Sequence, residues 1–278
     1  MDFTNVASLV SKMGIEKRNL LSKSKPYKVL YLTYDGMLDA LGLSQIMPYI
    51  KGIAKKEKYI HIISFEKPKK YIKSNIKFKR SINNLNIHWT PLRFTSELSI
   101  VGKLIDICVM LGFSSWIVWR NKIDVIHARS HIAAEIGFIL KIIFNIKLIF
   151  DFRGLWVDER VDKGGWNINN PIDRLQYKLW KYKERILLKY CDQLVILTKK
   201  VLPEVRKLGA TQKGKITIIP CCADYSHFKI HSEASRKAFK SEIAIPIESV
   251  VLGYLGSVGS MYRPDAYLEF LKISMIEE

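Results

Sequence analysis

Residues 124–154 have the sequence DVIHARSHIAAEIGFILKIIFNIKLIFDFRG. Two apolar runs, 124–130 and 147–154, flank a segment at 131–145 in which apolar side chains recur at helical spacing. The first run contains Val125, Ile126 and Ala128 and the second contains LIF at 148–150 and Phe152, and such apolar stretches are typical of strands that are buried on both faces. The stretch therefore predicts a strand, a crossover helix and a second strand parallel to the first.

The same alternation of strand and helix continues on both sides of this unit. Before it, we expect strands at 28–36, 59–65 and 86–92, helices at 43–56 and 96–121, and a lysine-rich loop at 67–80. After it, we expect a polar, glycine-containing loop to residue 170, a helix at 171–190, and a strand, a helix and a strand at 193–198, 201–209 and 216–222. Right-handed crossovers between such strands predict an α/β, doubly wound parallel sheet.

The pattern also predicts a second, incomplete unit. We expect a basic leader at 1–26, the doubly wound domain at 27–228 and a polar linker at 229–248. The start of a second domain at 249–278 then supplies one strand in SVVLGYLGSVG, residues 249–259, and one helix at 263–273. One strand and one helix cannot cover both faces of a sheet, so this unit looks truncated.

Composition excludes several classes of protein. The chain has 278 residues, of which 48% are hydrophobic, and a formal charge of +19. This excludes a disordered basic tail, a collagen-like repeat and a disulfide miniprotein. The four cysteines form no CxxC pair and no Cys/His run at zinc spacing, so we expect no metal site and no disulfide framework. The N-terminus lacks the apolar core of a signal peptide, and we expect a cytoplasmic protein.

Hydropathy and charge indicate what kinds of partner the chain could bind. The most apolar segment, 104–119, is interrupted by Asp106 and is shorter than the ~20 residues of a bilayer span, so we expect a buried or interfacial helix. Positive charge is spread over 51–58, 67–80 and 174–189. It favours an anionic membrane surface, a phosphorylated or polyanionic ligand, or nucleic acid. We discount nucleic acid because no aromatic-plus-basic RNA motif or recognition-helix pattern occurs.

Candidate site residues follow the predicted strands, because ligands of open parallel sheets bind at the carboxyl ends of the strands. The loop DGMLDALGLSQ at 35–45 places Gly36 and Gly42 before a helix, where free backbone N–H groups and the helix dipole can hold an anion. The loop matches neither GxGxxG nor GxxxxGK[ST]. The alternative is that both glycines only form turns.

Two more clusters follow the strands at 124–130 and 147–154. His127 beside Arg129 could orient a hydroxyl and a phosphate together, since histidine donates or accepts near neutral pH and arginine binds phosphate bidentately. Asp151 and Arg153 lie two apart on a strand and point the same way. The alternatives are a histidine bonded to backbone and a structural ion pair. We expect all four side chains to line one cleft with the loop at 36–42.

Five segments, in this order and spacing, resemble the family four glycosyltransferases of the GT-B fold. They are DGMLDALGLSQ, DVIHARS, FDFRGLWVDERV, IPCCADYSHF and VLGYLGSVGSMYRPD, and the resemblance covers residues 28 to about 265. It implies a Rossmann-like N-terminal domain that binds the acceptor. It also implies retaining transfer of a sugar from a nucleotide-diphosphate donor, with no metal and no cofactor.

The resemblance assigns roles to residues of this chain. It implies His127, Asp151 and Arg153 as catalytic residues, Asp35, Gly36, Gly42, Ser44, Gln45 and Arg129 as substrate-binding residues, and Gly256, Ser257 and Gly259 as contacts to the donor diphosphate. The chain departs from the family in three places. It has His127-Ala128-Arg129 where the family often has H-x-H, it has Cys221 and Cys222 in the family's IPNG position, and it ends before the donor domain's basic residues and E-x7-E carboxylate pair.

We therefore expect the N-terminal part of a glycosyltransferase that moves sugar to a cell-surface glycan or glycolipid acceptor. We expect it to be inactive alone, with a complementing donor-domain chain as a candidate partner. The +19 charge predicts peripheral, salt-sensitive attachment to the inner membrane face. The alternative is a non-catalytic basic domain that binds anionic membrane or a partner transferase.

Overall fold

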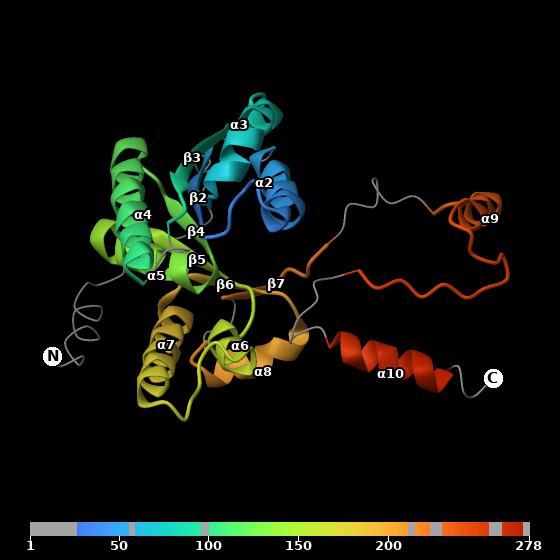
Figure 1. Ribbon diagram of the computed structural model, residues 1–278. Helices are drawn as coiled ribbons and strands as arrows, with labels where there is room; N and C mark the ends of the chain where they lie inside the picture. Colours follow the sequence, from blue (N-terminus) through green and yellow to red (C-terminus); the bar gives the residue numbers. More distant parts are fainter. Residues whose placement is uncertain are drawn as a thin grey trace.

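The computed structural model describes residues 27–55, 59–95, 100–210, 215–222, 230–255 and 263–274. In these residues, seven strands form one sheet in the order β3-β2-β1-β4-β5-β6-β7, and every neighbouring pair is parallel (Figure 1). The predicted doubly wound parallel sheet is confirmed. The strands are β1 (Lys28–Thr33), β2 (Tyr59–Glu66), β3 (Ile87–Arg93), β4 (Val125–Arg129), β5 (Lys147–Phe152), β6 (Gln193–Ile196) and β7 (Ile216–Ile218).

Helices connect the strands and cover the sheet. They are the π-helix η1 (Gly42–Ile46), α2 (Met47–Ala54), α3 (Pro68–Ile82), α4 (Ile100–Asn121), α5 (Ser130–Phe144), α6 (Trp156–Asp162), α7 (Pro171–Tyr190), the 3-10 helix η2 (Lys199–Val201) and α8 (Leu202–Lys207). The helix predicted at 171–190 has those bounds in the structure. It begins there because Asn170 accepts a hydrogen bond from the N–H of Ile172 and Pro171 occupies the first turn.

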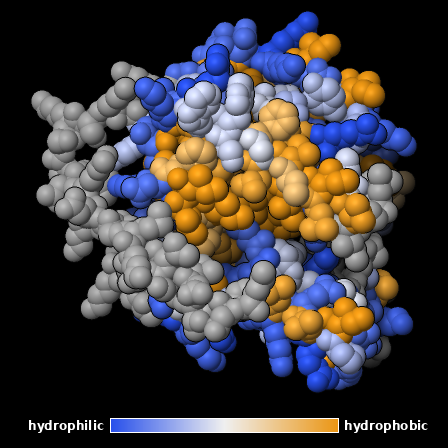
Figure 2. Space-filling view, turned by 90° about the vertical axis from the view of Figure 1, so that its left-hand side faces the viewer, coloured by the Kyte–Doolittle hydropathy of each residue, from blue (hydrophilic) through white to orange (hydrophobic). Residues whose placement is uncertain are grey.

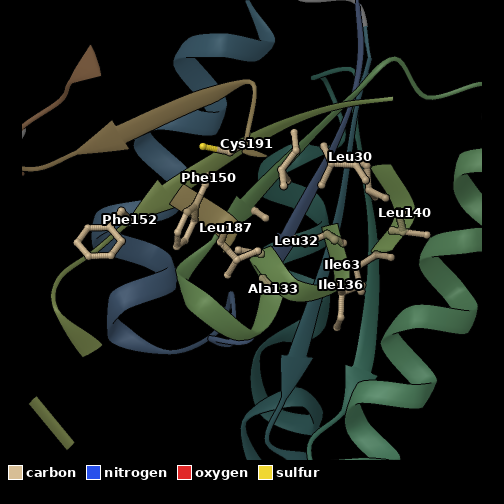
Figure 3. Packing of buried hydrophobic residues seen from close by; sticks show 14 of the residues in the cluster. Leu30, Leu32, Ile63, Ala133, Ile136, Leu140, Phe150, Phe152, Leu187 and Cys191 are labelled. Atoms are coloured by element: carbon tan, nitrogen blue, oxygen red, sulfur yellow. The ribbon is translucent and has the colours of Figure 1, made fainter. Parts of the chain in front are cut away.

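The two faces of the sheet bury separate cores, because successive side chains of a strand point to opposite faces. Leu30 and Leu32 of β1 lie in the larger core with residues of α4, α5, α7 and α8. Figure 3 shows part of this packing, including Phe150 of β5 and Leu187 of α7. Tyr31 lies in the smaller core on the other face, where α2 and α3 pack.

The chain adds strands first on one side of β1 and then, from β4 onwards, on the other side. From β1, β2 and β3 extend the sheet on one side, whereas β4 to β7 extend it on the other. β1 and β4 are direct neighbours, with Thr33 opposite Arg129. Their carboxyl ends therefore lead into connections on opposite faces, and in open α/β sheets ligands bind at such a switch point.

Three local expectations were wrong. The lysine-rich segment at 67–80 is not a loop but lies in α3, because Pro68 starts the helix and Phe78 and Ile82, one turn apart, are buried in the smaller core. The loop expected up to residue 170 contains α6. β7 ends at Ile218, so the predicted strand at 216–222 is shorter than expected.

The C-terminal part contains α9 (Glu233–Glu242) and α10 (Pro264–Ser274), which Figure 1 shows away from the sheet. The expected polar linker thus holds a helix, capped by Ser232, whose hydroxyl accepts from the N–H of Ser235. α10 forms where a helix was expected. Residues 249–255 form no strand, and both the rest of that predicted strand and the expected domain boundary near residue 228 lie outside the described residues.

One described helix segment, Val101–Asn121 of α4, is long and apolar enough to cross a membrane by length and composition, with 33% of its most apolar window buried. Such a single helix is weak evidence for a span, because a core helix of a globular domain satisfies the same criterion.

Candidate functional site

The four side chains expected at the sheet edge lie together. His127 and Arg129 project from β4 on the face of Tyr31, whose ring centroid lies 4.8 Å from that of His127. Asp151 is at the end of β5, opposite Arg129. Its Oδ2 lies 3.6 Å from Arg129 Nη1 and 3.8 Å from His127 Nε2, and its Oδ1 lies 3.5 Å from Arg153 Nη1. We call these four residues the edge cluster.

The loop after β1 closes one side of the edge cluster. Gln45, in the π-helix η1, accepts hydrogen bonds at its Oε1 from Nη2 of both Arg129 and Arg153, each at 3.2 Å. Asp35 Oδ2 lies 3.4 Å from Arg129 Nε. A single π-helical turn widens a helix locally, and such turns are frequent at functional sites. Here it presents Gln45 to both guanidinium groups.

Some polar atoms of the edge cluster are paired with opposite charges, whereas others have no hydrogen-bond partner among the described residues. Burial raises the pKa of the Asp151 carboxyl, but His127, Arg153 and Arg129 outweigh burial, so this pKa lies below its usual range. Burial is also the main cause that raises the pKa of Tyr31. His127 Nε2 and Asp151 Oδ1 are buried without a hydrogen-bond partner among the described residues. Because buried polar atoms are nearly always paired, these two atoms mark a place for a ligand or water.

The expected anion cradle at Gly36 and Gly42 is wrong in one respect. The backbone N–H groups of Met37 and Leu38 are not free but donate to Glu66 Oε1 and Oε2, at 2.7 and 3.1 Å. Glu66 ends β2 and is buried, and burial raises its pKa, although the Ser64 hydroxyl and these N–H groups lower it. A carboxylate of the protein thus already occupies these two N–H groups of the loop that was expected to hold an anion.

The glycines of this loop have a packing role. A Cβ on Gly42 would lie 2.2 Å from the carbonyl oxygen of Gly36, and a Cβ on Gly36 would lie 2.9 Å from the carbonyl oxygen of Phe65. The loop is therefore folded tightly against the end of β2. Ser44 donates to the carbonyl of Ala40, four residues earlier, and is exposed, so it does not join the edge cluster.

The segment after β7 borders the edge cluster. Arg153 Nη2 lies 3.4 Å from Cys221 Sγ. Tyr49 of α2 donates to the carbonyl of Pro220 and accepts from the N–H of Cys222, at 2.8 and 3.1 Å. This places the two cysteines that depart from the family motif at the rim of the site.

A second polar group begins at His131, two residues after Arg129, on the other face of the sheet. The imidazole of His131 is 2.9 Å from Glu184 Oε1, and both side chains are essentially inaccessible. Lys181 bridges Glu184 and Asp158 at 2.6 and 2.9 Å, and Tyr177 donates to Asp158. We call this set of five residues the buried network.

Ser130 separates the two groups. Its φ is +67°, a left-handed conformation that non-glycine residues rarely adopt. This reversal lets Arg129 point into the edge cluster and His131 into the larger core. The conformation is strained, and such strain is found most often at functional sites.

Sequence analysis missed Glu66, Tyr31 and Tyr49. Tyr31 could have been found from its register, because it lies directly opposite His127 on the neighbouring strand. Glu66 gave only one signal, a carboxylate at the end of an apolar strand. The expected donor contacts Gly256, Ser257 and Gly259 lie outside the described residues. Within the described residues, no group of three or more His, Cys, Asp or Glu side chains is placed to hold a metal ion.

No protein-family model matches the chain, and no curated protein matches it significantly. Among solved structures, Anabaena HepE in complex with UDP and glucose is similar, with a TM-score of 0.58 and 12% identity, covering 88% of this chain and 57% of that one. The HepE complex with UDP-glucose gives 0.55 at the same identity and coverage. Sucrose-phosphate synthase from Thermosynechococcus elongatus gives 0.53 at 12% identity, covering 79% and 53%.

At this identity the likeness shows the fold, and it confirms the predicted GT-B, Rossmann-like class. The chain spans little more than half the length of these structures.

Proposed function

We propose that this chain forms the acceptor-side domain of a retaining, family four glycosyltransferase that takes sugar from a nucleotide-diphosphate donor. The observation that carries the proposal is the edge cluster. One buried and one half-buried guanidinium group, one carboxylate and one imidazole meet at the point where the sheet reverses, and two polar atoms there have no hydrogen-bond partner among the described residues. The likeness to HepE, which is bound to UDP and glucose, supports a sugar nucleotide as donor.

The geometry divides the chemical work among the cluster residues. Arg129 and Arg153 are oriented by Asp151 and Gln45, so each keeps donors for a hydroxyl or phosphate oxygen. The Nε2 of His127, for which the described residues offer no hydrogen-bond partner, can orient the attacking acceptor hydroxyl or receive its proton. Preorganised cations near the reacting sugar stabilise a leaving diphosphate, and we propose that the arginines do this without a metal.

We further propose that residues beyond this domain are needed for transfer, supplied by further sequence or by a complementing donor-domain chain. The greater length of the similar structures supports this. The acceptor is proposed to be a cell-surface glycan or glycolipid, reached from the cytoplasmic face of the membrane. The alternative, a non-catalytic domain that binds membrane or a partner transferase, predicts no sugar ligand at the edge cluster.

Two soluble probes separate these alternatives. UDP-glucose, as donor, and a short-chain prenyl-diphosphate sugar, as acceptor analogue, are titrated separately into the full chain while backbone amide resonances are followed by NMR. We expect the acceptor analogue to shift resonances around Gln45, His127, Arg129 and Arg153. Arg129→Met should weaken binding about 10-fold or more, because a charge-assisted hydrogen bond is lost.

The matched control is Arg206→Met, which removes an exposed arginine on α8 and should bind as the wild type does. Equal binding by Arg129→Met, or shifts confined to other surfaces, contradicts the site assignment. In a separate assay, we expect the chain alone to form no product from nucleotide sugars. Product formation that His127→Ala abolishes would show that no further domain is needed.

A further inference from the structure

Helix α4 has an unusual distribution of polar and apolar side chains. Its inward face includes Asp106 and Ser114, both buried, whereas its outward face is apolar along its length. Exposed apolar side chains recur there at spacings of four and three, at positions 101, 105, 109, 113, 116 and 119. The six most exposed side chains of this face form what we call the outward stripe: Val101, Leu104, Ile105, Phe113, Trp116 and Trp119. The inward face also buries Met110, Ile117 and Val118, as a covering helix does, but a helix that merely covered a sheet would have a polar outward face.

The outward stripe is exposed and continuous. Trp119 is 71% and Leu104 58% accessible, and a shallow groove lined by Val109, Gly112, Phe113 and Trp116 runs between them. Between residues 101 and 119 the stripe extends ~27 Å, from the helical rise per residue. Figure 2, which views the side of the molecule where α4 lies, shows a broad hydrophobic area. Exposed apolar surface of this extent marks an interaction site.

We propose that the outward stripe of α4 inserts into the interfacial layer of an anionic lipid bilayer. Charge complementarity favours a membrane over a second copy of the chain. The formal charge of +19 repels another copy and attracts an anionic surface. The one carboxylate of α4, Asp106, points inward, and Arg120 lies over the Trp116 ring at 5.6 Å. Tryptophan with a neighbouring arginine is typical of side chains at the lipid headgroup level.

The helix lies in the interface and does not span the bilayer. It is the crossover between β3 and β4, which belong to one sheet, so α4 cannot leave without unfolding the domain. Asp106 accepts from the hydroxyl of Tyr34 at 2.9 Å and from the backbone N–H of Thr95 at 3.2 Å. A span would place this carboxylate in hydrocarbon, which is strongly unfavourable.

The same contacts set the direction of approach. Tyr34 immediately precedes Asp35, so the Asp106 end of α4 lies beside the sheet edge that carries the edge cluster. At the other end, Asn121 accepts from Lys28 at the start of β1. A bilayer lying along α4 would thus run past the carboxyl-end edge of the sheet, on the face opposite to the side chains of the edge cluster. Bilayer insertion does not itself require sugar transfer, and it goes beyond the proposed function.

Sedimentation of the full chain with vesicles tests the proposal. Vesicles of neutral phosphatidylcholine, with or without one quarter anionic phosphatidylglycerol, are used at low salt and at ~1 M NaCl, where the screening length is ~3 Å. We expect binding to anionic vesicles to persist at high salt, unlike attachment by charge alone. The variant Trp116→Ser/Trp119→Ser should weaken binding at least ~10-fold, because large apolar side chains no longer leave water.

The control is Ile72→Ser/Ile76→Ser, which removes two exposed apolar side chains from α3 and should bind like the wild type. Circular dichroism checks that every variant folds. Complete release at ~1 M NaCl together with unchanged binding of the tryptophan variant would overturn the proposal. A dimer without vesicles that the tryptophan variant abolishes would overturn it in favour of self-association. Since no sugar is present, the probe titration at the edge cluster stays an independent result.

Discussion

The edge cluster and the buried network are built from the same kinds of residue on adjacent parts of the chain, yet they differ in how completely they are satisfied. In the buried network the charged contacts of Glu184 are 2.9 and 2.6 Å long. In the edge cluster the contacts of Asp151 are 3.5 to 3.8 Å long, and its Oδ1 has no hydrogen-bond partner in the part of the chain that the structure describes. His131 Nδ1 is the one atom of the network without a partner among the described residues. Short, mutually paired charges hold helices together, whereas loosely paired charges at the edge of a sheet leave capacity for a ligand.

The largest expected effect comes from breaking the buried network. Glu184→Ala removes the shared partner of His131 and Lys181 and leaves buried polar groups uncompensated, so we expect the free energy of unfolding to fall by about 3–5 kcal/mol. Denaturant unfolding measures it. The control Glu233→Ala removes an exposed partner of Lys237 and should change stability by less than about 1 kcal/mol. Equal effects would show that burial does not distinguish the two pairs.

His61, which belongs to neither group, adds a comparison based on the pH dependence of stability. Burial, reinforced by His88, lowers the pKa of His61 to about 4 in the folded chain, against ~6.5 in the unfolded chain. Folding favours the neutral imidazole. The contribution of His61 to the free energy of unfolding is therefore fully present above pH ~6.5 and is lost as the pH falls to 4. We expect a loss of about 3 kcal/mol across this window, which His61→Gln should largely remove. If His61→Gln loses as much stability between pH 6.5 and 4 as the wild type does, the loss comes from other groups.

A substitution in the loop tests whether the shape of the edge cluster is fixed by packing. In Gly42→Ala the new methyl group would overlap the carbonyl oxygen of Gly36, so we expect about 1–3 kcal/mol of destabilisation and weaker binding of the acceptor analogue. Gly52→Ala in α2 meets no atom within 4 Å and should stabilise by about 0.4–1 kcal/mol. A stable Gly42→Ala variant with normal binding would show that the loop can rearrange.

The smallest expected effect on stability comes from the edge cluster itself. Asp151→Asn keeps the shape of the side chain and should cost only about 1 kcal/mol at pH 7. Because the folded pKa of Asp151 lies below its unfolded value of ~3.9, its stabilisation is present above that pH and is lost as pH falls through the folded pKa. The variant should therefore flatten the acid limb below pH ~4. Destabilisation as large as that of Glu184→Ala would place Asp151 among structural ion pairs.

Most of the fold could be predicted because the strands of a parallel sheet contain apolar runs, as in 193–198. The meeting of His127, Arg129, Asp151 and Arg153 could be predicted because both strands end at one edge. Helix α3 could not, since only Phe78 and Ile82 are buried and its lysines dominate the local pattern. The Glu66 contact also escaped, because it joins residues 29 and 28 positions apart and depends on the register of β1 and β2.

The left-handed backbone at Ser130 has a consequence for variation of this chain. Arg129, Ser130 and His131 are consecutive, but different requirements limit substitution at each position. Ligand chemistry limits the first, backbone geometry the second, and packing against α7 the third. Glycine should be the best replacement at Ser130, since it adopts φ of +67° without steric conflict. Saturation mutagenesis of these positions, scored separately for abundance and for ligand binding, should give three unlike tolerance profiles, with no gradual change from one residue to the next.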